Sequence, residues 1–284
     1  MLCPRTRTRT GTRGGNMGDT YDRRDNSGRV VIVTGAAGGI GEATVRLLHA
    51  QGASVIAVDL NDDGLAWAKE LPGVLRIPRS VAEEATNAAM VSAAIEAHGR
   101  LDAVALNAGI LVSGDILKGT MEDFDRVMNI NVRSVALGLK ASIQAMVDNE
   151  GPGRGAIVVT GSVSGLGGDA GLFAYDTSKG AVVNLARAAA MDVAHLGIRV
   201  NAVCPGPTRT GMTAHTQGRR IEQAMAARLP LNRFGEPREV AEAIAFLASP
   251  ASSFITGVAL PVDGGVTAGT GQWATPGGLA AGFM

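Results

Sequence analysis

The sequence predicts an α/β fold: a doubly wound parallel β-sheet of about seven strands, with helices on both faces, giving three α/β/α layers. Two observations predict it. From residue 29 onward, short runs rich in Val, Ala and Ile alternate with longer Ala-rich amphipathic stretches. The short runs lack strict apolar–polar alternation, which is typical of strands that are covered on both faces. Regular strand–helix alternation favours right-handed βαβ units around an open parallel sheet.

The expected elements follow one another without a break in composition. We expect strands at 30–34, 54–59, 74–77, 102–106, 155–160, 199–203 and 258–262. Between them, helical patterns cover 40–51, 62–70, 83–98, 121–148, 174–196 and 237–248. Because no linker interrupts the series, we expect residues 29–265 to form a single domain.

Residues 207–230 interrupt this rhythm between the sixth strand and the last helix. The insertion follows the carboxyl end of a strand, which is where α/β folds bind ligands. Long loops at such positions are usually functional, for example as lids. We therefore expect a substrate lid at 207–230, with an ordinary surface helix as the alternative.

The two ends of the chain differ from the domain between them. Residues 1–28 are rich in Arg, Thr and Gly and have almost no apolar side chains, so they cannot bury enough surface to fold. We expect a disordered extension or a translation start at Met17, and an Arg-rich transit peptide is the alternative. Residues 266–284 form a C-terminal tail that either reaches across a subunit interface or frays.

Composition excludes several classes of function. The 284 residues include 26 basic and 26 acidic side chains, and a net charge of zero argues against a nucleic-acid partner. No apolar stretch is long enough to predict a membrane span. The two cysteines, Cys3 and Cys204, do not suggest a disulfide, which favours a reducing compartment and a cytoplasmic location. The histidines are scattered, so no metal site is expected.

A glycine-rich turn occupies residues 34–41, between the first expected strand and the first expected helix. Glycines allow a sharp turn, a close approach to a pyrophosphate, and helix amides that point at it. The turn is followed by Asp59, 18 residues beyond Gly41, which is the context of a Rossmann-type dinucleotide site. The cofactor contacts expected in the turn are Gly35, Gly38, Gly39, Ile40 and Gly41.

Asp59 also indicates which dinucleotide binds. A carboxylate at this position accepts hydrogen bonds from the ribose hydroxyls of NAD and repels the 2′-phosphate of NADP. No Lys or Arg occurs at 36–40, or at Leu60 and Asn61, to offset that repulsion. We therefore expect NAD as the cofactor, with Leu60 beside Asp59 in its site.

Tyr175 and Lys179 are four residues apart, on one face of an expected helix. A tyrosine hydroxyl, with a pKa of about 10, needs a downward shift of roughly 3 units, about 4 kcal/mol, to act as a base at pH 7. A cation about 5 Å away contributes roughly 3 kcal/mol at an effective dielectric of about 20. Lys179 and one further positive charge, such as an oxidised nicotinamide, could supply the shift. The pair therefore predicts proton transfer to or from an alcohol oxygen.

Together these features resemble the single-domain form of the short-chain dehydrogenase/reductase family, over about residues 30–265. The glycine turn of the family is matched by Thr34, Gly35, Gly39 and Gly41. The Tyr–Lys pair of the family is matched by Tyr175 and Lys179. The other matching positions are Asn107-Ala108-Gly109, Asn131, Ser162, Pro205-Gly206, Thr208, Thr210, 233–237 and 262–265.

The resemblance implies four catalytic residues. Tyr175 is the implied general acid and base, and Lys179 lowers its pKa and holds the nicotinamide ribose. Ser162 is implied to bind the substrate oxygen, and Asn131 to hold a water that links Lys179 to solvent. Each residue taken alone also fits a structural role. Further implied cofactor contacts are Asn107, Ala108 and Gly109 on the adenosine side, and Pro205, Gly206, Thr208 and Thr210 near the nicotinamide carboxamide or the diphosphate.

One position departs from the family pattern. Relatives usually carry Asp at the end of the third strand, where it meets the adenine amine, and this chain has Ser80 there. A hydroxyl is a weaker acceptor than a carboxylate. Adenine recognition is therefore expected to depend also on backbone groups near Val81.

The resemblance also implies an assembly. Relatives are mostly tetramers or dimers that pair through the helices expected here at 121–148 and 174–196. Both segments are rich in Ala, Val and Leu on more than one side, which fits burial against a neighbouring subunit. We expect a homotetramer, with a dimer as the alternative.

The leading interpretation is an NAD-dependent oxidoreductase that interconverts a secondary alcohol and a ketone. Its pocket is expected to be mostly apolar, which favours an apolar or cyclic small molecule. A reductase of 3-oxoacyl thioesters is the first alternative, although Gly38 stands where such relatives often carry Arg. A non-catalytic NAD-binding protein is the second, and it gives no reason to keep all four catalytic residues. The expected pocket residues are Ser162, Ser164, Gly165, Leu166, Phe173 and Met212.

Overall fold

A seven-stranded sheet forms the centre of the molecule in the computed structural model, which describes residues 26–151 and 153–269. All strands are parallel, in the order β3-β2-β1-β4-β5-β6-β7. The order reverses next to β1, so the site of ligand binding is expected where β1 and β4 end. The strands are β1 (Val30–Thr34), β2 (Ser54–Asp59), β3 (Leu75–Pro78), β4 (Ala103–Leu106), β5 (Gly155–Thr160), β6 (Ile198–Pro205) and β7 (Ala259–Val262).

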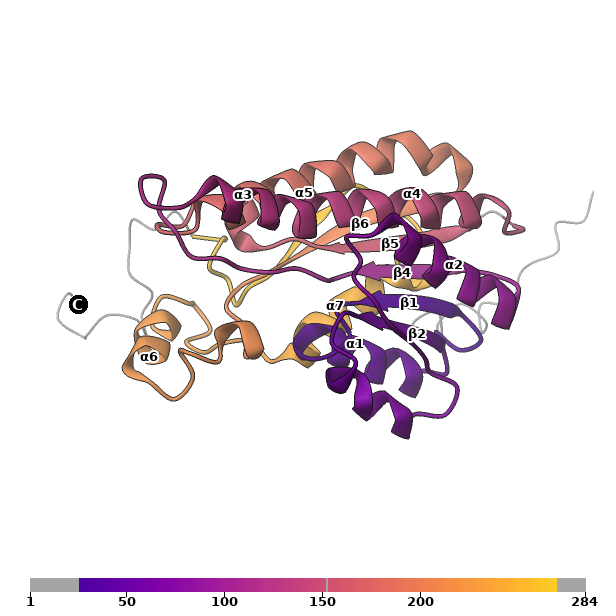
Figure 1. The fold of residues 1–284 in the computed structure, drawn as a ribbon, viewed down its shortest axis with the longest axis horizontal. Helices are drawn as coiled ribbons and strands as arrows, with labels where there is room; N and C mark the ends of the chain where they lie inside the picture. Colours follow the sequence, from indigo (N-terminus) through magenta and orange to yellow (C-terminus); the bar gives the residue numbers. More distant parts are fainter. Residues whose placement is uncertain (1–25, 152, 270–284) are drawn as a thin grey trace, which may run out of the picture.

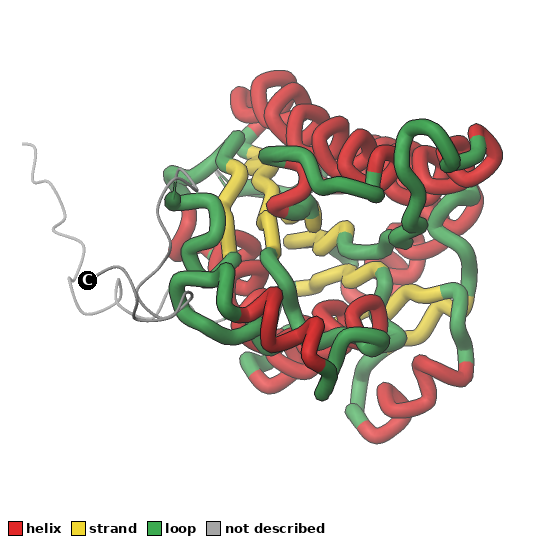
Figure 2. Tube along the Cα trace, turned by 90° about the vertical axis from the view of Figure 1, so that its left-hand side faces the viewer, coloured by secondary structure: helices red, strands yellow, loops and turns green. Residues whose placement is uncertain are grey.

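Helices cover both faces of the sheet (Figure 1). One layer contains α1 (Gly39–Ala50), α7 (Pro237–Ala248) and the 3₁₀ helix η2 (Asp63–Glu70). The other contains α2 (Glu84–His98), α4 (Ser134–Val147) and α5 (Phe173–Val193). In the view turned by 90°, the strands lie between the two sets of helices (Figure 2). The remaining helical segments are α3 (Met121–Met128), η3 (Asn129–Arg133), η4 (Val163–Gly165), η5 (Ala194–Leu196), η6 (Gly211–Thr213), α6 (Arg220–Ala226) and η7 (Pro250–Ser252).

The apolar strands explain the two cores. Side chains alternate across a strand, so in β1 Val31 and Val33 pack with α1 and α7, while Val30 and Ile32 pack with α2, α4 and α5. All five residues of β1 are buried. The predicted three-layer α/β fold is confirmed.

Three local expectations need correction. The segment expected to be an ordinary helix at 62–70 is a 3₁₀ helix, η2, and the third strand lies at Leu75–Pro78 instead of 74–77. The helix expected at 121–148 is interrupted by a π-helical turn at Asn129–Arg133. The insertion at 207–230 contains η6 and the short helix α6, which lies beyond one end of the sheet, apart from both helical layers (Figure 1).

The expected extension and tail lie mostly outside the described residues. The last three residues of the extension are described, and Asn26 is buried and donates a hydrogen bond to the Gln51 side chain (2.7 Å). The described fold therefore includes residues 26–28, three residues that were expected to belong to the extension. Of the tail, residues 266–269 are described, and Thr267 donates to the Asp263 carboxylate (2.6 Å).

Two features that the sequence does not predict, a membrane span and a metal site, can be checked in residues 26–151 and 153–269. Within these residues, no helix is both long and apolar enough to cross a membrane. The same residues contain no group of three or more His, Cys, Asp or Glu side chains arranged to hold a metal ion. Cys204 is a buried free thiol, and Cys3 lies outside the described residues.

Candidate active site

The glycine turn connects β1 to α1, and two of its glycines have no room for a side chain. A Cβ on Gly41 would overlap the carbonyl oxygen of Gly35. Gly35 itself has φ +68°, and a Cβ there would lie 2.9 Å from the Cα of Ala108. The turn therefore packs directly on the chain that leaves β4, which brings the first and fourth strand ends together.

Asn107, which follows β4, connects the ends of β1, β4 and β5 through hydrogen bonds. Its amide nitrogen Nδ2 donates to the carbonyl of Thr34 at the end of β1 (3.2 Å), and its Oδ1 accepts from the Thr160 hydroxyl at the end of β5 (3.1 Å). The Thr34 hydroxyl accepts from the backbone amides of Asn107 (3.0 Å) and Ala108 (3.1 Å). These bonds fix the carboxyl edge of the sheet beneath the glycine turn.

Asp59 ends β2 beside the glycine turn. Its Oδ2 accepts from the backbone amide of Ala37 (3.0 Å), and its Oδ1 accepts from that of Asn61 (2.9 Å). A carboxylate has about four acceptor positions, so both oxygens keep capacity for ribose hydroxyls. Leu60, the next residue, is 72% exposed.

Ser80 and Val81 lie past β3, at the same edge of the sheet. The Ser80 hydroxyl accepts from the backbone amide of Ala82 (3.3 Å), and the Val81 carbonyl accepts from the Asn87 side chain (2.8 Å). The Ser80 side chain thus closes a local turn, and Asn87 of α2 holds the segment in place.

The residues around the turn fit a dinucleotide. Gly38 has an extended backbone (φ 179°), and a Cβ built on it would meet nothing within 4 Å, so space is open above the start of α1. The first amides of a helix have no partners within the helix and attract anions. A Cβ on Gly39 would lie 3.1 Å from the Thr210 side chain, so the segment after β6 borders the same space.

Pro205 and Gly206 lead from β6 into that segment. The Gly206 amide donates to the Val262 carbonyl (3.0 Å), and a Cβ on Gly206 would lie 2.8 Å from the Cα of Asp263. The Thr208 hydroxyl donates back to the Gly206 carbonyl (2.9 Å). This turn therefore needs glycine because the segment after β7 packs against it.

Three expected catalytic residues lie close together where β5 ends and α5 begins: Tyr175, Lys179 and Ser162. All three are buried, with 8%, 4% and 6% of their surface exposed. The Lys179 Nζ lies 5.7 Å from the centre of the Tyr175 ring and donates to the Thr160 carbonyl (2.9 Å). Ser162 follows β5, and its hydroxyl accepts from the Ser164 amide (3.1 Å). The expected proton-transfer pair and the substrate-binding serine are thus adjacent.

Burial governs the proton affinities of this group. Desolvation lowers the pKa of Lys179 to about 8, partly offset by the Cys204 thiol. Desolvation also raises the pKa of Tyr175; a hydrogen bond with Ser162 lowers it in part, and the Asp176 and Asp169 carboxylates raise it further. In the chain without a cofactor the Tyr175 pKa is therefore raised, because removal from water is the largest of these effects.

Asn131 lies in the π-helical turn η3 and is 1% exposed. Its side chain accepts from the Ile110 amide (2.8 Å) and donates to the Ile110 carbonyl (2.9 Å) and to the Ser178 hydroxyl (3.0 Å). A Cβ on Gly109 would lie 3.2 Å from the Asn131 Oδ1 and 3.4 Å from the Lys179 Nζ. Asn131 and Lys179 therefore both pack close to Gly109.

The residues expected at the substrate come from three segments. Ser164, Gly165 and Leu166 form or follow η4, and a Cβ on Gly165 would lie 2.6 Å from the Lys179 backbone. Phe173 begins α5 and stacks on Phe124 of α3 at 5.8 Å. Met212 lies in η6 and is 42% exposed, so it belongs to the insertion rather than to the buried group.

The comparisons with known proteins decide the family. A family model described as "Enoyl-(Acyl carrier protein) reductase" matches residues 35–267. The chain is similar to the crystal structure of a short-chain type dehydrogenase/reductase from Mycobacterium marinum, with a TM-score of 0.81 and 34% identity, covering 87% of this chain and 99% of the other. This chain belongs to the short-chain dehydrogenase/reductase family.

Curated members of the family are similar over most of their length. A meso-2,3-butanediol dehydrogenase of Serratia marcescens is 39% identical over 88% of this chain and 98% of its own. A cis-4-hydroxycyclohexanecarboxylate dehydrogenase of Sinomonas cyclohexanicum is 42% identical over 84% of this chain and 97% of its own. The short-chain dehydrogenase/reductase resemblance predicted from the motifs is confirmed.

Two acidic residues near the family's tyrosine were not expected. Asp169 accepts from the Ser164 hydroxyl (2.7 Å), and its backbone amide donates to the Asp176 carboxylate (2.6 Å). Burial raises the pKa of Asp176. Asp176 stands next to Tyr175 in the motif, which is a signal in the sequence, whereas only the folded loop brings Asp169 to Ser164. Leu166 and Phe173 are apolar, whereas Asp169 and Asp176 bring carboxylates to this side of the expected pocket.

Proposed function

We propose that this protein is an NAD-dependent oxidoreductase that interconverts a secondary alcohol and a ketone. The observation that supports it most strongly is the buried group of Tyr175, Ser162 and Lys179 beside an open glycine turn. Asn107 and Thr160 link the two parts, because Thr160 bonds Asn107 with its side chain and Lys179 with its carbonyl. These two bonds fix the proposed proton-transfer residues relative to the proposed cofactor site.

Tyr175 is the proposed general base in oxidation and the general acid in reduction. Ser162 hydrogen-bonds the substrate oxygen, positions it and stabilises the charge that develops there. NAD, when bound, supplies hydride transfer at its nicotinamide ring. Because burial raises the Tyr175 pKa in the chain alone, ionisation near neutral pH requires positive charge from both Lys179 and the oxidised nicotinamide.

Lys179 and Asn131 are proposed to pass the proton on toward solvent. The pKa of Lys179, lowered to about 8 by burial, allows its ammonium to release a proton near neutral pH. Asn131 and Lys179 both pack close to Gly109, and the Asn131 side chain is fixed by Ile110 and Ser178. A water held there by Asn131 would complete the path.

NAD is proposed in preference to NADP because of Asp59. Its carboxylate is anchored by the Ala37 and Asn61 amides at the turn, where the adenosine ribose is expected. A fixed negative charge repels a 2′-phosphate. The remaining proposed contacts are Gly35, Gly38, Gly39, Ile40, Gly41, Leu60, Ser80, Val81, Asn107, Ala108, Gly109, Pro205, Gly206, Thr208 and Thr210.

An apolar or cyclic alcohol is the proposed substrate class. Leu166 and Phe173 supply apolar surface, and the names of the two curated relatives denote a diol and a ring alcohol. The alternative, an acyl-carrier-protein substrate, is suggested by the description of the matched family model. A non-catalytic NAD-binding protein is the remaining alternative.

One panel of substrates tests the proposal and its alternatives. Linear diols, ring alcohols, their ketones and a 3-oxoacyl thioester are each assayed with NAD(H) and NADP(H), following absorbance at 340 nm. We expect ring or linear alcohols with NAD to give the highest kcat/KM. Higher turnover with NADP(H) would overturn the cofactor assignment, a preference for the thioester would favour the reductase, and no turnover at all would favour the binding protein.

Three further proposals concern organisation. We propose that residues 29–265 act as one catalytic domain, with 207–230 as its substrate lid. A homotetramer is proposed from the family, with pairing through the region of α3–α4 and through α5. The cytoplasm is proposed from the cysteine usage, since a chain with two cysteines, of which Cys204 is a buried free thiol, suits a reducing compartment.

A further inference from the structure

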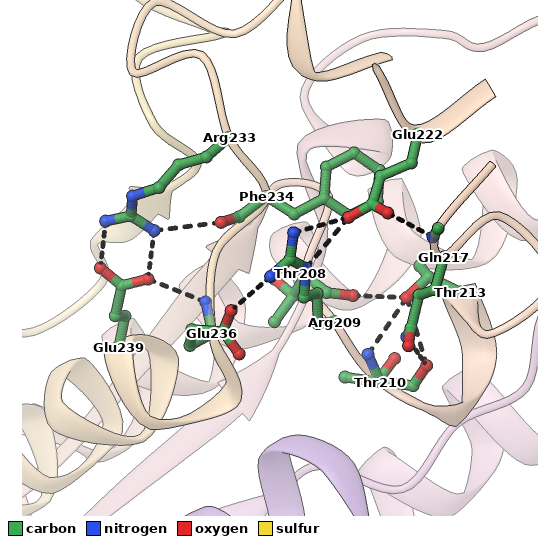
Figure 3. Close-up of polar contacts among 11 residues, drawn as sticks. Thr208, Arg209, Thr210, Thr213, Gln217, Glu222, Arg233, Phe234, Glu236 and Glu239 are labelled. Atoms are coloured by element: carbon green, nitrogen blue, oxygen red, sulfur yellow. Dashed lines mark hydrogen bonds and ion pairs between the residues drawn. The ribbon is translucent and has the colours of Figure 1, made fainter. Parts of the chain in front are cut away.

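Arg209 is held between acidic residues of two different elements (Figure 3). Its Nε and Nη2 donate to the Oε1 of Glu222 in α6 (3.0 and 2.8 Å), and its Nη1 donates to the Oε1 of Glu236 (3.2 Å). The Glu222 side chain is only 12% exposed. We call these three residues, Arg209, Glu222 and Glu236, the latch.

Both acidic ends of the latch are fixed within their own elements. The second oxygen of Glu222 accepts from the Gly218 amide (2.6 Å), which closes the turn that leads into α6. Glu236 is the N-cap of α7 and forms a capping box with Glu239. Since α7 packs on the sheet, Arg209 connects the small outlying helix α6 to the rigid body of the molecule.

The backbone of Arg209 belongs to the segment that borders the cofactor space. Its amide donates to the Gly235 carbonyl (2.9 Å), and the Gly235 amide donates to the Pro207 carbonyl (2.9 Å), so the segment pairs like an extended strand. Side chains alternate along such a segment. Thr208 and Thr210 therefore point away from the latch, and Thr208 is buried while Thr210 meets the glycine turn.

We propose that Arg209 is a positioning residue, which latches α6 to α7 and thereby fixes Thr208 and Thr210 against the cofactor site. The inference rests on the proposed NAD-dependent function. The bond to Glu222 contributes most, because it uses two nitrogens of the guanidinium and a carboxylate that is largely shielded from solvent. The longer bond to Glu236 is exposed on both sides and contributes less.

A direct contact of Arg209 with the cofactor phosphates is the competing explanation. Arg209 lines a cavity of about 470 Å³ together with Gly39 and Thr210, next to the start of α1. Three of its nitrogens, however, already donate to carboxylates. The two explanations predict opposite effects at Glu222, because neutralising this residue weakens a latch but frees the charge of a phosphate ligand.

The test is a double-mutant cycle on the full chain with Arg209→Gln, Glu222→Gln and the double variant. Arg238→Gln is the matched control, since Arg238 forms an exposed ion pair with Glu242 within α7 (3.4 Å). NADH binding is measured by fluorescence without substrate, and amide hydrogen exchange is measured across Arg220–Ala226. The KM for NADH and kcat are measured with the best ketone.

If Arg209 is a latch, both single variants weaken NADH binding about five- to tenfold and the double variant is no worse than either. KM for NADH rises more than kcat falls, and exchange in Arg220–Ala226 accelerates, while Arg238→Gln behaves as wild type. Unchanged binding and exchange in Arg209→Gln would overturn the proposal. Tighter NADH binding by Glu222→Gln would overturn it in favour of a phosphate contact.

The exchange measurement separates this proposal from the function on which it rests. If the wild type binds no NADH, the proposed function fails, yet hydrogen exchange still reports whether Arg209 holds α6. If NADH binds and exchange in α6 is the same in wild type and Arg209→Gln, the latch fails and the proposed function stands.

Discussion

At the scale of single residues, the site depends on a balance between burial and charge. Tyr175 and Lys179 are both removed from water, which raises the pKa of the phenol and lowers that of the ammonium. Each shift disfavours the charged form. The chain by itself therefore keeps the tyrosine hydroxyl protonated, and in the proposed mechanism positive charge arrives with the cofactor before the tyrosine accepts a proton.

Replacing Tyr175 by Phe should remove turnover without removing cofactor binding. We expect kcat to fall about 10²- to 10⁴-fold, the usual contribution of a general acid or base. The ring is kept, so NADH should bind within about twofold of wild type, as measured by fluorescence. Thr177→Ala, two residues away on the exposed side of α5, is the control. A Phe variant that keeps a tenth of the wild-type rate would refute the role of Tyr175.

The lowered pKa of Lys179 should appear as a pH dependence of stability. Between its folded pKa of about 8 and its usual 10.5, the unfolded chain binds more protons than the folded one. The free energy of unfolding therefore rises with pH through this window, and the penalty is full below pH 8. We expect wild type to gain roughly 2 to 3 kcal/mol relative to Lys179→Met between pH 7 and pH 10, measured by urea unfolding. A difference that is independent of pH would contradict this.

At the scale of elements, the turn between β1 and α1 contains two kinds of glycine. One kind is required by packing, and the other is expected to be required only for cofactor binding. Gly41 has the Gly35 carbonyl where its side chain would be, so its lack of a Cβ is a packing requirement. Gly38 has an ordinary extended backbone and open space, so packing does not require glycine there. A glycine is therefore needed at this position only if a ligand, such as the proposed pyrophosphate, approaches the turn closely.

The two glycines can be told apart by matched alanine variants. Gly41→Ala should destabilise the fold by about 1 to 3 kcal/mol, as expected for overpacking, and should also weaken NADH binding. Gly38→Ala should leave the thermal midpoint nearly unchanged but weaken NADH binding measurably. Equal stability of both variants would contradict the packing assignment, and normal NADH binding by Gly38→Ala would contradict a pyrophosphate at the turn.

The elements also show where sequence patterns stop being informative. The strands and the main helices could be predicted because apolar periodicity and glycine turns are local signals. The π-helical turn at Asn129–Arg133 has no such signal, since it accompanies the bonds of Asn131 to Ile110 and Ser178, which are 21 and 47 residues away. The 3₁₀ form of η2 and the partners of Arg209 likewise depend on contacts that exist only in the folded chain.

The same distinction holds for the candidate site. Tyr175, Lys179, Ser162 and Asn131 could be predicted because each lies in a short motif, and the structure brings them close together. Asp169 could not, because its approach to Ser164 depends on the path of the loop between η4 and α5. The upward shift of the Tyr175 pKa could not be predicted from the sequence either, because it depends on how deeply the packed fold buries the side chain.

At the scale of the whole molecule, large apolar side chains remain exposed away from the candidate site. Met191 on α5 is 82% exposed, and Phe254, between β6 and β7, is fully exposed. The loop containing Phe254 packs beside α5, since a Cβ on Gly257 would lie 3.7 Å from the Ala190 side chain. Exposed apolar side chains near one helix fit the proposed pairing of subunits through α5.

A charge placed on α5 should therefore lower the molecular mass in solution. Light scattering of the wild type should give about four times the 29.0 kDa of the chain, as expected for a D₂ tetramer. Met191→Glu should shift the mass toward a dimer or monomer, because it introduces a charge into an apolar contact. Ile116→Glu, at a residue before α3 that is 74% exposed, is the control. A tetramer that tolerates Met191→Glu would exclude this part of α5 from the interface.

The side-chain amide of Asn107 has a mechanical consequence. It holds Thr34, which opens the glycine turn, and Thr160, whose carbonyl holds Lys179. These hydrogen bonds connect the two parts of the candidate site, whereas the proposed Arg209 latch connects α6 to α7. Loss of the Asn107 side chain would therefore disturb the glycine turn and the support of Lys179 together. The proposed lid at 207–230 takes part in none of these Asn107 and Lys179 bonds and would be the part that opens and closes.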